Sequence, residues 1–85
     1  MIKDMKVIKV YSKTCGPCRV LEDNLTLASI THESVDIDTP RGEEVVDKFN
    51  IRGIPTLLLL DDNGNEIKRN VGVLTIEGIN KFINE

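Results

Sequence analysis

The 85-residue sequence has no tryptophan, a single histidine and two cysteines, and aromatic residues make up only 4% of it. Two cysteines cannot build a disulfide-rich secreted scaffold, and they ligate zinc only with the help of further ligands. No apolar run approaches the roughly 18 residues that indicate a membrane span. The formal net charge of −3 argues against nucleic acid or an anionic membrane as the main partner.

The remaining composition is that of an ordinary folded domain. Apolar residues are 40% and charged residues 29% of the chain, which is too apolar for a disordered protein. A chain of this length has room for one domain, which we expect to span residues 1–85. Residues 1–10 alternate lysine with apolar residues and lack the apolar core of a signal peptide. We therefore expect a cytoplasmic protein, in a compartment where structural disulfides are rare.

Short apolar segments alternate with helical patterns along the whole chain. Segments rich in Val, Ile and Leu predict strands at residues 5–11, 34–38, 57–60 and 66–71. Segments with apolar residues at helical spacing predict helices at residues 15–28, 40–49 and 76–83. A helix joins the first two strands, so they should be parallel, whereas the turn at 62–65 should make the last two an antiparallel hairpin. The expected fold is α/β, in the order β-α-β-α-β-β-α, with a four-stranded mixed sheet and helices on both faces.

The second and third helices carry clear start signals. Thr39 is an expected N-cap, and Pro40 follows it at the first helical position. Thr75 should cap the last helix. The buried face of the second helix should consist of Val45, Val46 and Phe49. The buried face of the third should consist of Ile76, Ile79, Phe82 and Ile83.

The two cysteines lie three positions apart, in Cys15-Gly16-Pro17-Cys18, where the first strand gives way to the first helix. Two intervening residues let both sulfurs approach on the first helical turn. At the helix N-terminus, free backbone N–H groups and the positive end of the helix dipole stabilise a thiolate. We therefore expect Cys15 to attack a partner's disulfide and Cys18, more buried, to resolve the mixed disulfide. Pro17 stiffens the loop without leaving an unsatisfied N–H.

The alternative interpretation of this pair is a metal half-site or an inert pair of thiols. A metal site would need further cysteine or histidine ligands. The one candidate is His32, which we expect to be exposed in a loop on the far side of the helix.

Three segments together make the chain resemble the thioredoxin family over nearly its whole length. Cys15-Gly16-Pro17-Cys18 matches the active site of that family. The segment Ile51-Arg52-Gly53-Ile54-Pro55-Thr56 is similar to its cis-proline segment, and Val71-Gly72-Val73-Leu74 resembles the end of its last strand. The resemblance implies a thioredoxin-like fold.

The resemblance also implies a substrate groove beside the cysteines, formed by Ile54, Pro55, Thr56 and Gly72. Pro55 would be cis and packed against the two sulfurs. The backbone of Ile54 would pair with a substrate peptide as an added strand. Gly72 would keep the floor of the groove low, because it carries no side chain.

The sequence departs from the family at two positions near the cysteines. Thr14 stands where thioredoxins usually have a tryptophan, which removes an apolar contact from the docking surface. Lys9 stands where the family keeps a buried aspartate, six residues before the nucleophile. Lys9 either tunes the thiol pKa values or relays a proton, or it packs its stem while its ammonium reaches water. Lys13 either favours the thiolate or is a solvated loop charge.

The resemblance implies a dithiol–disulfide oxidoreductase that reduces protein disulfides. No bound cofactor is needed, because the Cys15–Cys18 pair itself cycles between dithiol and disulfide. An NADPH-dependent thioredoxin reductase, a flavoprotein, would recharge it, and ribonucleotide reductase is one conceivable substrate. A monomer is expected. Two alternatives remain open: a glutaredoxin-like protein recharged by glutathione, and a thioredoxin-fold binding module whose dithiol is incidental.

Overall fold

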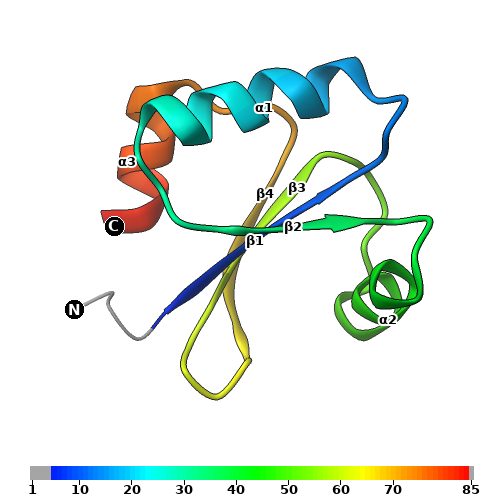
Figure 1. The fold of residues 1–85 in the computed structure, drawn as a ribbon. Coiled ribbons are helices and arrows are strands. Elements are labelled where there is room, and N and C mark those ends of the chain that lie inside the picture. Colours follow the sequence, from blue (N-terminus) through cyan, green and yellow to red (C-terminus); the bar gives the residue numbers. More distant parts are fainter. Residues whose placement is uncertain (1–4, 85) are drawn as a thin grey trace.

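A mixed sheet forms the centre of the computed structural model, which describes residues 5–84 (Figure 1). Its four strands are β1 (Lys6–Tyr11), β2 (Glu33–Asp36), β3 (Thr56–Leu60) and β4 (Glu66–Val71), in the spatial order β2-β1-β3-β4. β1 and β2 run parallel, whereas β3 is antiparallel to both β1 and β4. The predicted element order, parallel pair and hairpin are therefore confirmed.

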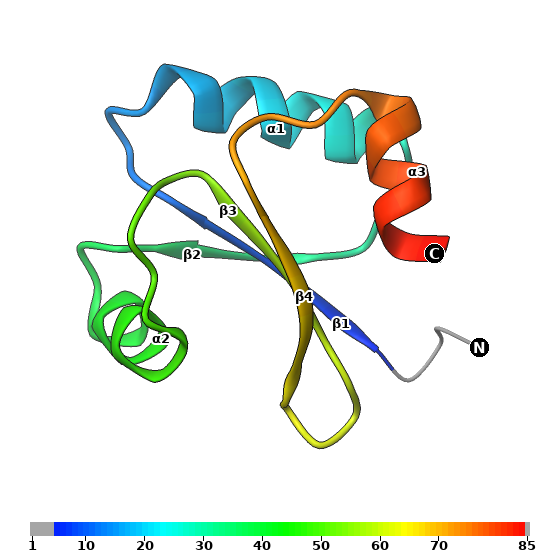
Figure 2. The ribbon, with the colours of Figure 1, turned by 180° about the vertical axis from the view of Figure 1, so that it is seen from behind.

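Three helices cover the two faces of this sheet (Figures 1 and 2). α1 (Gly16–Leu27) and α3 (Ile76–Asn84) contact each other and lie on one face, and α2 (Pro40–Phe49) lies on the other. As predicted, Thr39 caps α2, its hydroxyl accepting the N–H of Gly42 at 3.0 Å. Asn50 ends that helix in the left-handed conformation, with φ of 52°.

The alternation of side chains along β1 and β3 divides the buried residues between two cores. The core under α1 and α3 contains Val7, Leu21, Leu25, Leu57, Leu59, Ile79 and Ile83. The core under α2 contains Ile8, Val10, Val35, Val45, Leu58 and Leu60. Every residue of β3 is buried, as the continuous apolar run predicted for a strand covered on both faces.

Two predictions about these elements were wrong in detail. Ile76 was expected on the buried face of α3 but is 40% exposed, because it lies in the first turn of the helix. The second strand was expected at residues 34–38 but ends at Asp36. There the Asp36 carboxylate accepts the N–H of Asp38 at 2.9 Å, and the Asp36 carbonyl accepts the Thr39 hydroxyl at 2.7 Å. These bonds turn the chain away from the sheet and into α2.

Candidate active site

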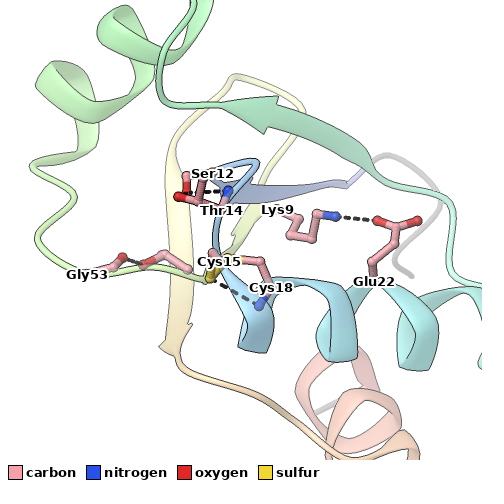
Figure 3. The surroundings of a disulfide bond; sticks show 8 residues. Lys9, Ser12, Thr14, Cys15, Cys18, Glu22 and Gly53 are labelled. Atoms are coloured by element: carbon pink, nitrogen blue, oxygen red, sulfur yellow. Dashed lines mark hydrogen bonds and ion pairs between the residues drawn. A yellow bond between two sulfur atoms is a disulfide. The ribbon is translucent and has the colours of Figure 1, made fainter.

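The two cysteines form a disulfide at the start of α1 (Figure 3). β1 ends at Tyr11, and a short loop leads to Cys15, which is the N-cap residue of α1. The loop is held by the Cys15 N–H, which donates to the Ser12 carbonyl at 3.3 Å. The Cys15 sulfur accepts the N–H of Cys18 at 3.2 Å. This contact shows the nucleophile position receiving a free N–H of the helix N-terminus, as the sequence predicted.

The two sulfur-bearing residues differ in burial. Cys18 is only 2% exposed, whereas Cys15 is partly exposed and is flanked on the surface by Thr14 and Gly16. The first turn of α1 contains no acidic residue, so no carboxylate there offsets the positive end of the helix dipole. These features suit Cys15 to attack a partner and Cys18 to act within the molecule.

The proline segment meets the end of β4 beside this disulfide. The Ile54–Pro55 peptide bond is cis, as the resemblance implied. The Pro55 carbonyl accepts the N–H of Gly72 at 2.8 Å, which joins the loop before β3 to the residue after β4. Gly72 has φ of 104°, a conformation that favours glycine, and no atom lies within 4 Å of the place a Cβ would take. The surface above Gly72 is therefore open.

The four residues expected to form the groove do not contribute equally to the surface. Ile54 and Gly72 are partly exposed, whereas Pro55 and Thr56 are fully buried. The Thr56 hydroxyl donates to the Gly53 carbonyl, so its side chain supports the loop from inside. Of these four residues, only Ile54 and Gly72 therefore contribute to the surface in this structure.

Lys9 is buried on the same sheet face as α1, at 4% exposure. Its Nζ donates to the carboxylate of Glu22 (Figure 3) and also lies 4.6 Å from the centre of the Tyr11 ring. The interpretation in which the ammonium reaches water is therefore wrong, because α1 covers the end of the side chain and supplies a carboxylate for it. Lys13, in contrast, is 81% exposed and lies 3.9 Å from the Asp36 carboxylate.

Glu22 is a member of the site that sequence reasoning missed. One of its carboxylate oxygens accepts from Lys9 and lies 3.1 Å from His32 Nε2 and 3.4 Å from the Ser34 hydroxyl. The only signal in the sequence was its position four residues after Cys18, which places both on one side of a helix.

His32 is not the exposed loop residue that was expected. Its side chain is 10% exposed, and Nδ1 donates to the Ile30 carbonyl at 2.9 Å while Nε2 faces Glu22. The exit loop after α1 is short, so it brings the ring back against that helix. Among residues 5–84, no three His, Cys, Asp or Glu side chains are grouped so that they could hold a metal ion.

Glu22 should contribute to stability above pH 4.5 and lose that contribution in acid. The hydrogen bond from Lys9 lowers the pKa of Glu22 from 4.5 to about 2; partial burial opposes this shift, and His32 adds to it. A carboxyl whose pKa is lower in the folded state stabilises the fold above the unfolded pKa, and the gain disappears as pH falls through the folded pKa.

Chemical unfolding of Glu22→Gln should therefore show reduced stability at pH 7, and the difference from the wild type should shrink between about pH 4.5 and pH 2. Asp62→Asn, in the exposed turn between β3 and β4, is the control and should show a smaller difference. A difference for Glu22→Gln that stays constant over this range would show that the ion pair contributes nothing.

Comparison with known proteins bears on this site directly. The family model for thioredoxin matches residues 2–85. This chain belongs to the thioredoxin family. A thioredoxin of Chlamydia trachomatis is 34% identical over 85 aligned residues, which cover 93% of this chain and 79% of that protein. An SPbeta prophage-derived thioredoxin-like protein, YosR of Bacillus subtilis, is 35% identical over 68 residues, covering 80% and 82% of the two chains.

Solved structures agree with this assignment. A mutant thioredoxin from Halobacterium salinarum superimposes with a TM-score of 0.81 at 29% identity, over 95% of this chain and 73% of that one. The predicted thioredoxin-like fold is thus confirmed, with the disulfide of this family present between Cys15 and Cys18. The site is that of a thioredoxin-family thiol–disulfide oxidoreductase, with a buried lysine where the family usually keeps an aspartate.

Within residues 5–84, the longest helices fall short of what a bilayer crossing requires in length and apolar character.

Proposed function

We propose that this thioredoxin-family protein reduces disulfide bonds in other proteins and is recharged by an NADPH-dependent thioredoxin reductase. The observation that carries the proposal is the asymmetry of the disulfide. Cys15 is partly exposed at the N-terminus of α1, and its partner Cys18 is buried one turn later. A pair of this kind can present one sulfur to a protein substrate while it keeps the other for the second step.

The reaction begins with the dithiol form. The Cys15 thiolate attacks one sulfur of the substrate disulfide, a mixed disulfide forms, and the other substrate sulfur leaves as a thiolate that takes a proton from water. Cys18 then loses its proton, and its sulfur attacks Cys15. The bond between Cys15 and the substrate breaks, and the second substrate sulfur leaves. Two electrons have passed from the protein to the substrate, and the Cys15–Cys18 disulfide remains.

The groove beside the disulfide is the proposed place for the substrate chain. Ile54 is partly exposed there, and the surface over Gly72 is open. An extended peptide that pairs with the backbone of Ile54 would bring its own disulfide to Cys15. Suitable substrates are proteins with an accessible disulfide, and ribonucleotide reductase is one such protein.

The return of the oxidised protein to the dithiol needs two electrons. We propose that they come from NADPH through a flavoprotein reductase, that the protein works as a monomer in the cytoplasm, and that it binds no cofactor of its own. A reducing cytoplasm would keep the donor supplied.

The test is NADPH consumption with insulin as the disulfide acceptor. One arm contains a bacterial thioredoxin reductase, and the other contains glutathione with glutathione reductase. We expect turnover in the first arm. Turnover only in the second arm would replace the proposed donor with glutathione. Should neither arm respond while dithiothreitol still drives insulin reduction, the reductase proposal is wrong for these donors and the disulfide chemistry stands. Insulin reduction that dithiothreitol cannot drive would overturn the proposed function itself.

A further inference from the structure

The buried sulfur of Cys18 shares a cleft with the Lys9–Glu22 ion pair. The cleft has a volume of about 440 Å³, and Lys9, Cys18 and Glu22 are among its lining residues. Lys9 faces α1 because its cross-strand neighbour Leu57 packs in the core under α1 and α3. Glu22 lies one helical turn beyond Cys18. The ion pair therefore lies beside the resolving cysteine, behind the surface that a substrate would contact.

A buried ammonium at this position calls for a physical reason. Removing a charge from water is costly, and apolar residues of similar size often replace a buried ion pair without loss of stability. Val7, two residues earlier on the same strand face, is such an apolar residue. A lysine is useful at this position if a neighbouring group becomes negative during the reaction. In the dithiol form the Cys18 thiol is a group that does so.

We propose that the Lys9–Glu22 ion pair controls how readily the Cys18 thiol loses its proton. In this arrangement Lys9 stabilises the Cys18 thiolate, and Glu22 is a positioning residue that holds the ammonium and limits its effect. The inference rests on the proposed function, because Cys18 must become a thiolate before it can attack Cys15 and release the substrate. The proton leaves to water through the open side of the cleft.

Among the cationic side chains that line the cleft, Lys9 is the one expected to affect the Cys18 sulfur most strongly. Lys13, Arg19 and Asp23 also line the cleft, but Lys13 and Arg19 are exposed, so salt and water weaken their effect on the sulfur. Charges interact more strongly where they are buried, and Lys9 is only 4% exposed.

The other groups that contact the pair are few. Among residues 5–84, Tyr11 lies under the ammonium, and Thr26, His32 and Ser34 contact the Glu22 carboxylate. These contacts fix Glu22 and thereby fix Lys9. Within the described part of the chain, Tyr11 and His32 are the other titratable groups in contact with the pair, so every variant in the titration keeps both.

The test is an NMR titration of the Cys18 thiol in the reduced full-length protein, followed through a ¹³C label at its Cβ. Lys9→Met should raise the pKa of the Cys18 thiol by about one unit, a tenfold loss of thiolate at neutral pH. Glu22→Gln should lower the pKa of the Cys18 thiol by a similar amount. In this variant the Lys9 ammonium, which attracts the thiolate, remains, whereas the Glu22 carboxylate, which repels it, is removed. The double variant should return close to the wild type.

Matched controls come from the same strand and from a second ion pair. Lys6→Met changes a lysine on the opposite face of β1, and Glu33→Gln removes the carboxylate that pairs with Lys6 and Arg41. Neither should move the Cys18 titration. The same set of variants is assayed for insulin reduction driven by dithiothreitol.

Opposite shifts from the two variants support the proposal, because a purely structural role would move both titrations the same way or neither. The proposal is overturned if the Cys18 titration is unchanged in both variants, or if both variants shift the Cys18 pKa in the same direction. If Lys9→Met does not fold, the direction of the Glu22→Gln shift decides alone. Wild-type insulin reduction by dithiothreitol with unchanged titrations would mean that only this inference fails. Absence of that reduction in the wild type would show that the proposed function fails, independently of the titration result.

Discussion

Replacing Cys15 with serine should lower the reduction of insulin disulfides to the background rate of the reductant, a loss on the order of 10³-fold. Cys15 is the partly exposed sulfur at the N-terminus of α1, and Cys18 is too buried to meet a protein substrate. A serine hydroxyl at position 15 would stay protonated at neutral pH, and it could not form a mixed disulfide. The measurement is the initial rate with dithiothreitol as reductant.

A fold control is needed for this result, because the variant also loses the disulfide. Circular dichroism of Cys15→Ser should match that of the reduced wild type, since the two cores lie under the helices and do not depend on the bond. A well-folded Cys15→Ser protein that retains a tenth or more of the wild-type rate would contradict the assignment of Cys15 as the nucleophile.

Gly42→Ala should largely abolish stable folding. A Cβ at this position would lie 1.9 Å from the Asp36 carbonyl oxygen and 2.7 Å from the Ile37 Cα, both of which are backbone atoms. Alanine favours a helix over glycine by about 1 kcal/mol, but the overlap forces α2 away from the end of β2. We expect a net loss of about 3 kcal/mol or more, which is a large part of the stability of a small domain.

Urea unfolding followed by circular dichroism measures this effect, and Gly78→Ala is the matched control. Gly78 also lies in a helix, but a Cβ there would meet only side-chain atoms, with Leu74 Cδ2 at 3.2 Å and Thr75 Oγ1 at 3.3 Å. The Leu74 side chain can move aside, so the control should change stability by no more than about 1 kcal/mol. Equal stabilities for the two variants would show that the turn between β2 and α2 is not as tight as described.

The order of elements and the position of the disulfide could be predicted from the sequence because both depend on local signals. The alternation of helical and strand periodicity follows from which side chains reach the core. The placement of Cys15 at a helix start follows from the strand before it and the apolar helical face after it. The Thr39-Pro40 start of α2 is likewise a short-range feature, and the structure confirms it.

The contacts that could not be predicted join residues that are distant in the sequence. Lys9 contacts Glu22, which lies thirteen residues later in the chain. His32 contacts the same carboxylate from a loop whose path the sequence does not predict. Their partners depend on how α1 crosses the sheet, which periodicity does not determine. Gly42 is another case, since its need for glycine arises from the close approach of α2 to the backbone at Asp36.

If Cys15 attacks and Cys18 resolves, removal of Cys18 should trap the mixed disulfide at Cys15. Each single-cysteine variant, Cys15→Ser and Cys18→Ser, is mixed in reduced form with a peptide disulfide, and the covalent adduct is measured by mass spectrometry. We expect Cys18→Ser to accumulate a lasting adduct at Cys15 rapidly, whereas Cys15→Ser should form little or none. Equal adducts in the two variants, or a faster one at Cys18, would contradict these roles of the two cysteines.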